Sequence, residues 1–138
     1  MKIAIINGPN LNLIGEREKD IYGSETFEHY FNKLRKKYET IDFDYFQSNI
    51  EGELVNEIQQ AAKYMNGIIL NAGAYTHTSV AIGDAIASIK IPVIEVHISN
   101  VTAREEFRKI SHISAKCAGT IFGFGLKGYE LAVQSFLI

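Results

Sequence analysis

Short aliphatic segments alternate along this chain with longer segments in which apolar residues recur every three or four positions. The aliphatic segments are residues 2–6, 68–70, 93–96 and, less purely, 120–124. Uninterrupted apolar runs of this length are typical of strands that are buried on both faces of a sheet. The segments with helical spacing cover residues 27–38, 54–65 and 82–89. Such an alternation of strand and helix indicates a fold built on a parallel sheet.

A fifth strand is predicted over residues 41–45, where apolar and polar side chains alternate as they do at a sheet edge. Five strands with intervening helices predict an α/β fold of the flavodoxin-like type. This is a doubly wound five-stranded parallel sheet in the order 2-1-3-4-5, with helices on both faces. The chain has 138 residues, enough for the core of one domain but too few for a (β/α)₈ barrel of about 250 residues. We therefore expect a single domain over residues 1–138.

The charges of the chain are balanced, and it has one cysteine. With 14 basic and 16 acidic residues, the formal net charge of −2 gives no sign of a nucleic-acid-binding surface. No apolar run approaches the length of a membrane span or of a signal-peptide core. Cys117 has no pairing partner within the chain, which suits a reducing compartment. The sequence therefore predicts a cytoplasmic protein without nucleic-acid or membrane partners.

The connection over residues 8–23, GPNLNLIGEREKDIYG, is long for a compact domain. It follows the first strand and so begins at the carboxyl edge of the sheet, where open α/β folds place their ligands. Long loops in small domains are often functional, and we interpret this segment as a lid over a site. A surface excursion without function is the alternative.

Polar side chains gather just after the predicted strands. Asn10 follows the first strand, Asn71 and His77 follow the third, and His97 and Ser99 lie at the end of the fourth. A single asparagine at such a place is commonly a turn residue. Because parallel strands end at the same edge of a sheet, the convergence of these side chains indicates a site.

His97 has a carboxylate two residues earlier on the same strand. Glu95 and His97 share one face of that strand, so Glu95 can orient the imidazole and stabilise its protonated form. A histidine held in this way is a good general acid, although a lone histidine at a strand end is often only structural. His77, in the sequence THTS, has no such partner and is expected to bind a ligand hydroxyl or to cap the following helix.

Three arginines are placed to form an anion site. Arg104 and Arg108 are four residues apart in a segment, residues 102–110, that could form two helical turns after the fourth strand, and Arg17 lies in the predicted lid. Guanidinium groups favour a carboxylate or phosphate ligand. The alternative is a solvated helix surface on which they pair with acidic neighbours. Tyr22, at the end of the lid, could ionise near neutral pH beside two guanidinium groups, whereas loop tyrosines more commonly pack or donate a hydrogen bond.

Three other features resemble known functional motifs, but the surrounding sequence argues against each of them. The spacing GxGxxG at residues 123–128 follows a strand, but too little chain remains for a dinucleotide site, so it predicts a tight turn before the last helix. Cys117 precedes a strand and has no nearby histidine, which argues against a catalytic thiol. A metal site could be assembled from His77, Asp84, Glu95 and His97, but these residues do not have the spacing typical of metal ligands. We expect neither a metal nor a cofactor.

Four stretches of the sequence together resemble one enzyme family. They are INGPNLNLIGERE with DIYG in the first connection, ILNAGAYTHTSVAI in the middle, IPVIEVHISNVTAREEFR after it, and GFGLKGYELA near the end. Over nearly its whole length the chain resembles the type II 3-dehydroquinate dehydratases. The resemblance implies a cofactor-free dehydration of 3-dehydroquinate to 3-dehydroshikimate. The reaction is an anti elimination through an enolate, in aromatic amino acid biosynthesis (the shikimate pathway) or in quinate breakdown.

The resemblance also implies roles for individual residues. The implied catalytic set is Tyr22 as the base, His97 as the acid, Glu95 orienting His97, Arg17 stabilising charge, Arg104 keeping the tyrosine ionised, and Asn10 holding a water against the enolate oxygen. The implied substrate-binding set is Asn71, His77, Asp84, Ile98, Ser99 and Arg108. The family forms dodecamers built from trimers, so a homododecamer that binds a small anionic substrate is implied as well.

The chain departs from the family pattern at a few positions. Lys19 stands in the lid where proline is usual, Gly83 stands before Asp84 where a larger side chain is common, and Ala115 replaces a common proline. Lys19 gives the lid more backbone freedom than proline would. None of these departures removes an implied catalytic group.

The alternative function is a flavodoxin-like ligand-binding or signalling module without catalysis. A flavin-binding module would need a hydroxyl-rich phosphate loop after the first strand, and GPNLNLIG offers none. A phosphate-accepting receiver would need acidic residues where this chain has Asn7 and Asn71.

Overall fold

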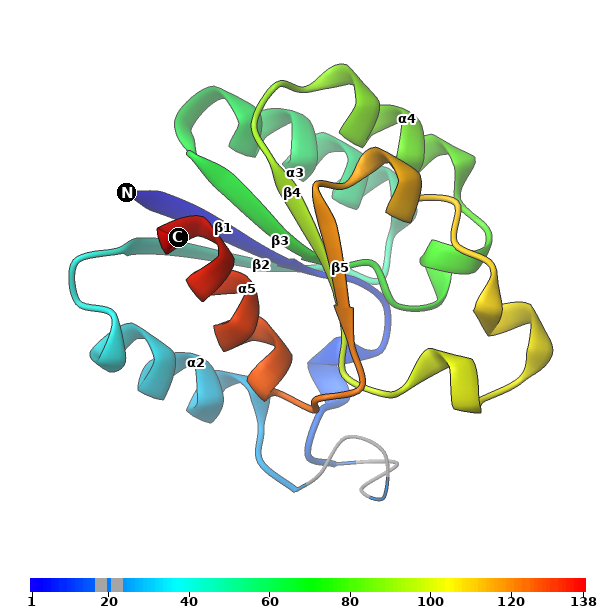
Figure 1. The fold of residues 1–138 in the computed structure, drawn as a ribbon, viewed down its shortest axis with the longest axis horizontal. Helices are drawn as coiled ribbons and strands as arrows, with labels where there is room; N and C mark the ends of the chain where they lie inside the picture. The colour runs from blue at the N-terminus through cyan, green and yellow to red at the C-terminus, as the bar shows by residue number, and fades with distance from the viewer. Residues whose placement is uncertain (17–19, 21–23) are drawn as a thin grey trace.

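The computed structural model describes residues 1–16, 20 and 24–138 and shows a five-stranded sheet with helices on both faces (Figure 1). The strands are β1 (Lys2–Asn7), β2 (Asp42–Gln47), β3 (Gly67–Asn71), β4 (Val93–His97) and β5 (Gly119–Phe122). All neighbouring strands are parallel, and their order is β2-β1-β3-β4-β5. The flavodoxin-like arrangement predicted from the sequence is confirmed.

The sheet separates two apolar cores, and helices cover both of its faces (Figure 1). The helices are α2 (Phe27–Lys37) and α5 (Lys127–Leu137) on one face, and α3 (Glu51–Tyr64) and α4 (Val80–Ser88) on the other. In β1, Ile3 and Ile5 join the core under α2 and α5, whereas Ala4 and Ile6 join the opposite core. Each fully buried isoleucine contributes roughly 1.5–3 kcal/mol to stability. None of the helices among the described residues is long and apolar enough to cross a membrane.

Helices α2 and α4 begin where the sequence supplies a capping hydroxyl. The Thr26 hydroxyl accepts a hydrogen bond from the backbone N–H of His29 at 3.2 Å, and Ser79 accepts one from Ile82 at 2.9 Å. The cap of α4 is therefore Ser79 and not His77, because a capping side chain must lie next to the first helical turn. This leaves His77 available for the site.

The segment after β4 does not form the two helical turns predicted over residues 102–110. It forms two short 3-10 helices, Val101–Ala103 and Glu106–Lys109, with extended backbone at Arg104 and Glu105 between them. The large apolar side chains of this segment are exposed, so an α-helix here would gain little from packing. The two arginines consequently reach the site from separate turns.

Strand β5 differs from the expectation of a strand buried on both faces. Its residues alternate between half-buried and exposed, because only β4 pairs with it at this edge of the sheet. After β5, Gly123 and Gly125 have φ angles of 94° and 62°, which residues with a side chain rarely adopt. They form the predicted tight turn, and α5 begins at Lys127.

Candidate active site

A pocket opens at the carboxyl edge of the sheet, beyond the ends of β1, β3 and β4. Eight of the predicted site residues line it: Asn10, Asn71, His77, His97, Ile98, Ser99, Arg104 and Arg108. The remaining described residues of the lining are Pro9, Leu11, Gly73, Ala74 and Val101. Residues far apart in the sequence thus share one concave surface, because the parallel strands that carry them end at the same edge.

His97 lines the pocket with Glu95 as its buried partner. Both side chains project from the same face of β4, and Nε2 of His97 donates a hydrogen bond to Oε1 of Glu95 at 2.7 Å. Burial raises the pKa of Glu95, but hydrogen bonds from His97 and Ser114 outweigh burial and hold that pKa below its ordinary value. Glu95 is therefore a carboxylate at neutral pH. Because it occupies Nε2, Nδ1 of His97 is the nitrogen that can meet a ligand.

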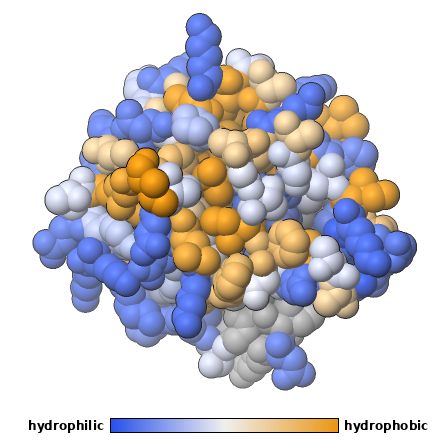
Figure 2. Space-filling view, in the orientation of Figure 1, coloured by the Kyte–Doolittle hydropathy of each residue, from blue (hydrophilic) through white to orange (hydrophobic). Residues whose placement is uncertain are grey.

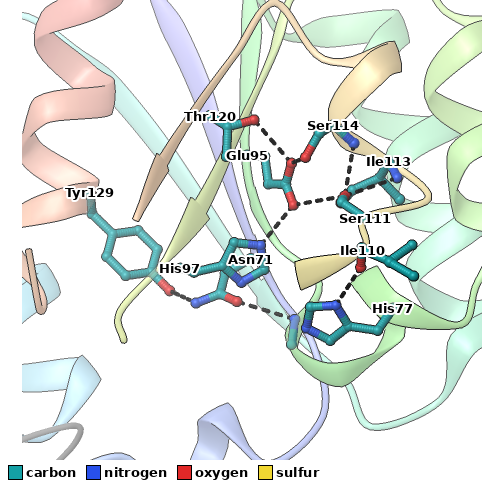
Figure 3. A network of polar contacts seen from close by, with 11 residues as sticks. Asn71, His77, Glu95, His97, Ile110, Ser111, Ile113, Ser114, Thr120 and Tyr129 are labelled. Atoms are coloured by element: carbon teal, nitrogen blue, oxygen red, sulfur yellow. Dashed lines mark hydrogen bonds and ion pairs between the residues drawn. The ribbon is translucent and has the colours of Figure 1, made fainter. Parts of the chain in front are cut away.

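Three hydroxyl groups complete the surroundings of Glu95 (Figure 3). Ser111 donates to Oε1 at 3.3 Å, Thr120 donates to Oε2 at 3.1 Å, and Ser114 also donates to Oε2. Sequence reasoning missed these three residues. Thr120 could have been found by aligning the two predicted strands, because it lies opposite Glu95 in the pairing of β5 with β4. Ser111 lies in an irregular segment and Ser114 begins the short 3-10 helix Ser114–Lys116, so no sequence pattern indicated either residue.

His77 stacks near His97 in the pocket, with the two ring centroids 6.3 Å apart. Its Nδ1 donates a hydrogen bond to the backbone oxygen of Ile110 at 2.7 Å, since a carbonyl oxygen can only accept. Burial lowers the pKa of His77, the contact with Ile110 opposes that effect, and the charges of His97 and Arg108 add to the lowering. His77 is therefore neutral at pH 7, and its Nε2 is an acceptor suited to a ligand hydroxyl.

Arg104 and Arg108 make the pocket electropositive. Arg104 donates from Nη1 to the hydroxyl of Ser99 at 3.4 Å, and Nε of Arg108 pairs with Glu105 at 2.9 Å. The guanidinium of Arg108 also lies 4.9 Å from the ring centre of Phe107. Pairing with Glu105 is expected if the arginines lie on a solvated surface. Their side chains are only 18% and 19% exposed, however, and both line the pocket. Two guanidinium groups held in this way favour an anionic ligand.

The first connection turns sharply as it leaves β1. The backbone N–H of Gly8 donates to the backbone oxygen of Asn71 at 2.7 Å, and a Cβ at Gly8 would lie 2.6 Å from the backbone oxygen of Ala72. Asn10 follows with a φ of 68°, which asparagine tolerates, and its N–H donates to Asn49 at 3.0 Å. These contacts set Asn10 at the edge of the pocket.

Buried polar groups orient Asn71 (Figure 3). Its Nδ2 donates to the hydroxyl of Tyr129 at 3.0 Å, and its Oδ1 accepts from the backbone N–H of Gly73 at 3.1 Å. The Tyr129 hydroxyl donates in turn to Oδ1 of Asn7 at 2.7 Å. Burial raises the pKa of Tyr129, so it remains a neutral phenol. With both ends of its amide engaged, Asn71 presents one fixed orientation to the pocket.

We expect Tyr129→Phe to lower the free energy of unfolding by about 1–3 kcal/mol, because Asn7 and Asn71 would each lose a buried hydrogen-bond partner. Urea denaturation followed by circular dichroism measures this change. Tyr64→Phe is the matched control, since Tyr64 is exposed. Equal stability of the Tyr129 and Tyr64 variants would contradict the prediction.

The described lining of this pocket does not include every predicted site residue. Asp84 is exposed on α4 and does not line it. Arg17, Lys19 and Tyr22 lie outside the described residues. The predicted lid, residues 8–23, is thus described over residues 8–16 and at Asp20.

Neither a metal centre nor a reactive thiol is evident in the described part of the chain. Over residues 1–16, 20 and 24–138, no three His, Cys, Asp or Glu side chains are grouped to bind a metal ion. Burial raises the pKa of Cys117 to about 12, and the charge of Glu95 adds to the effect. A thiol with so high a pKa is a poor nucleophile at neutral pH.

Fold and pocket together define a class of protein. It is a doubly wound α/β protein with a small electropositive pocket at the carboxyl edge of its sheet, and a carboxylate-paired histidine lines this pocket. A family model described as dehydroquinase class II matches residues 1–137. The chain belongs to the class II dehydroquinase family.

Relatives and solved structures agree with this assignment. The chain is 54% identical to the 3-dehydroquinate dehydratase of Fusobacterium nucleatum, with 96% of the chain and 94% of the relative covered. It is 53% identical to the 3-dehydroquinate dehydratase of Campylobacter jejuni, with coverage of 99% and 87%. The crystal structure of the type II dehydroquinase from Butyrivibrio crossotus superposes with a TM-score of 0.96 at 49% identity, covering 100% of this chain and 98% of that one.

Proposed function

We propose that the chain is a 3-dehydroquinate dehydratase, which converts 3-dehydroquinate to 3-dehydroshikimate and water by anti elimination through an enolate. The observation that carries the proposal is the buried pair of Glu95 and His97, because His97 lines the same pocket as Arg104 and Arg108. Membership of the class II dehydroquinase family supports the same reaction. The reaction serves the shikimate pathway to aromatic amino acids or the breakdown of quinate.

The elimination needs a base, an acid and a stabilised enolate. Tyr22, as a phenolate kept ionised by Arg104, takes the proton alpha to the ketone. The electron pair left behind forms the enolate, whose oxygen is held by a water bound to Asn10, while Arg17 stabilises the developing charge. The enolate then expels the hydroxyl from the next carbon as His97 donates its Nδ1 proton to it, so that water leaves and a conjugated enone forms. The roles of Tyr22, Arg17, Arg104 and Asn10 rest on the family resemblance.

The proposed substrate-binding residues are Asn71, His77, Asp84, Ile98, Ser99 and Arg108. Ile98 and Ser99 offer a backbone N–H and a hydroxyl to the substrate carboxylate, and Nε2 of His77 accepts a hydrogen bond from a substrate hydroxyl. Asp84, which is exposed on α4, contacts a substrate only if a neighbouring copy of the chain brings it to one. We propose neither a metal nor a cofactor for this reaction.

We also propose that the protein assembles as a cytoplasmic homododecamer, a tetramer of trimers. Large apolar side chains on the surface support an assembly, since Phe107, Ile110 and Phe124 are 54%, 62% and 61% exposed. Figure 2 shows apolar residues gathered across the middle of one face, between more hydrophilic regions. Analytical ultracentrifugation tests this: a particle of twelve 15.4-kDa chains is expected, and a stable monomer would contradict it.

We expect the wild-type protein to raise the ultraviolet absorbance of a 3-dehydroquinate solution as the enone forms, with or without a metal chelator. Tyr22→Phe is expected to lower the rate by about 10²- to 10⁴-fold, because phenylalanine cannot take the alpha proton. A folded wild-type protein that gives no rise would contradict the proposal. Binding of 3-dehydroquinate without turnover would then favour the alternative, a binding module.

A further inference from the structure

One segment of the chain is connected to both histidines of the pocket. It contacts His77 directly and reaches His97 through the carboxylate of Glu95. Residues 110–114, which we name the serine segment, accept a hydrogen bond from His77 at the backbone oxygen of Ile110 and donate hydrogen bonds to Glu95 (Figure 3). Glu95 in turn holds His97. The mechanism above uses the two histidines but assigns nothing to the hydroxyl groups of this segment.

The hydroxyl of Ser111 has a defined direction. Its oxygen accepts hydrogen bonds from the backbone N–H groups of Ile113 at 3.2 Å and of Ser114 at 3.0 Å. With the lone pairs of that oxygen engaged, its proton is directed to Oε1 of Glu95 at 3.3 Å. In the hydrogen bond between Ser111 and the carboxylate, Ser111 is therefore the donor and Glu95 is the acceptor.

The carboxylate of Glu95 receives donors on both oxygens. Oε1 accepts from His97 and Ser111, and Oε2 accepts from Ser114 and Thr120. Because all four partners donate, the arrangement favours the ionised carboxylate. It also requires a proton on Nε2 of His97. The second proton of the imidazolium must then be on Nδ1, which is the nitrogen left for the ligand.

The serine segment is anchored by contacts outside the pocket. The backbone N–H of His112 donates to the backbone oxygen of Thr76 at 2.8 Å, and the side chain of Ile113 is fully buried. The backbone oxygen of His112 approaches α4 so closely that a Cβ at Gly83 would lie 2.6 Å from it. The glycine that departs from the family pattern thus permits a contact that a larger residue would displace.

We propose that Ser111, Ser114 and Thr120 are positioning residues, which hold Glu95 as an oriented carboxylate so that His97 presents its transferable proton on Nδ1. None of the three is among the described residues that line the pocket. The proposal rests on the proposed function only in taking His97 as the acid of the reaction. The other charged or titratable groups around the pair are His77, Arg104, Arg108 and Cys117, and the variants below leave them unchanged.

The test removes hydroxyl groups one at a time. Thr120→Val keeps the shape of the side chain without its hydroxyl, Thr120→Ser keeps the hydroxyl, and Ser114→Ala removes the other donor to Oε2. Ser88→Ala is the matched control, because the Ser88 hydroxyl donates to the backbone of its own helix, to Ala85 at 2.7 Å. Thermal unfolding establishes that each variant is folded.

Two measurements report the geometry without turnover. Nitrogen-15 NMR detects which ring nitrogen of neutral His97 carries the proton, with His97→Gln for assignment, and carbon-13 NMR follows the titration of the Glu95 carboxyl. We expect one tautomer, with the proton on Nε2, in the wild type and in the Thr120→Ser and Ser88→Ala variants. In Thr120→Val and Ser114→Ala we expect both tautomers and a Glu95 titration at higher pH, because the carboxylate has lost a donor.

Kinetics complete the test. We expect kcat of Thr120→Val and Ser114→Ala to fall about tenfold or more, with KM changed less than about threefold, and Thr120→Ser to recover the wild-type kcat. The proposal is overturned if both folded variants keep a single tautomer and the wild-type Glu95 titration, or if kcat falls equally in Ser88→Ala. If the wild-type protein forms no enone, the proposed function fails, and the NMR measurements still decide whether these hydroxyl groups position the pair.

Discussion

His97→Gln is expected to lower kcat for enone formation by about 10²- to 10⁴-fold, because the variant loses the group that protonates the departing hydroxyl. A glutamine amide can still donate a hydrogen bond to the buried carboxylate of Glu95, so the fold is expected to persist. The amide does not release a proton at accessible pH, however. The initial rate of the absorbance rise at saturating 3-dehydroquinate measures kcat. We expect KM to change less, because the proposed substrate-binding residues, including Arg108, are unchanged.

The control is the same substitution, histidine to glutamine, at a surface position. His29 is exposed on α2 and pairs with Glu25 at 2.7 Å, and it does not line the pocket. His29→Gln is therefore expected to keep the wild-type kcat. If His97→Gln changed only KM, His97 would be a binding residue and the acid would have to be another group.

The sheet was predictable because its central strands are buried on both faces. β1 and β3 are covered on each side, so nearly every position takes an aliphatic residue, and the runs at residues 2–6 and 68–70 mark them. The same signal misled at residues 120–124, where an apolar run lies at a sheet edge and is half exposed. Spacing also failed at residues 102–110. Two arginines four residues apart satisfy helical geometry, but a helix also needs an apolar face to pack, and this segment has none.

The composition of the pocket was predictable for a topological reason, whereas the groups that orient its residues were not. Asn71 and His97 had to lie at one edge because they end parallel strands. The backbone oxygen of Ile110 and the hydroxyl of Ser111 reach the site from a segment without periodicity. The path of that segment depends on its packing against Gly83, which is far away along the chain. No local pattern encodes such a contact.

Glu95→Gln is expected to impair both activity and stability. Four groups donate hydrogen bonds to the carboxylate, whereas glutamine offers one accepting oxygen and a donating NH₂. If the NH₂ faces His97, Nε2 must accept instead of donating, and a carboxylate no longer holds the ring. If the NH₂ faces Ser114 and Thr120, their hydroxyl groups lose an acceptor. We expect kcat, measured from the absorbance rise, to fall about a hundredfold or more, because His97 loses the carboxylate that orients its ring.

The stability loss in Glu95→Gln is expected to depend on pH. Burial raises the pKa of Glu95, but hydrogen bonds from His97 and Ser114 outweigh it, so the native pKa lies below that of the unfolded chain, about 4.3. The ionised carboxylate therefore stabilises the native state fully above that pH, and this contribution is lost as the pH falls through the lower native value. We expect the variant to unfold with about 1–3 kcal/mol less free energy than the wild type at neutral pH. The difference should shrink below about pH 4.

Urea denaturation over a series of pH values measures this difference, with Glu106→Gln as the control. Glu106 pairs with Lys109 at 2.9 Å but is exposed, so its variant is expected to unfold as the wild type does. A difference for Glu95→Gln that stayed constant on acidification would contradict an ionised Glu95. Glutamine resembles the protonated acid, so the two proteins can converge at low pH only if the wild-type residue carries its charge at neutral pH. The same carboxylate accepts the hydrogen bond that orients His97, so this stability measurement also tests the partner proposed for the acid of the reaction.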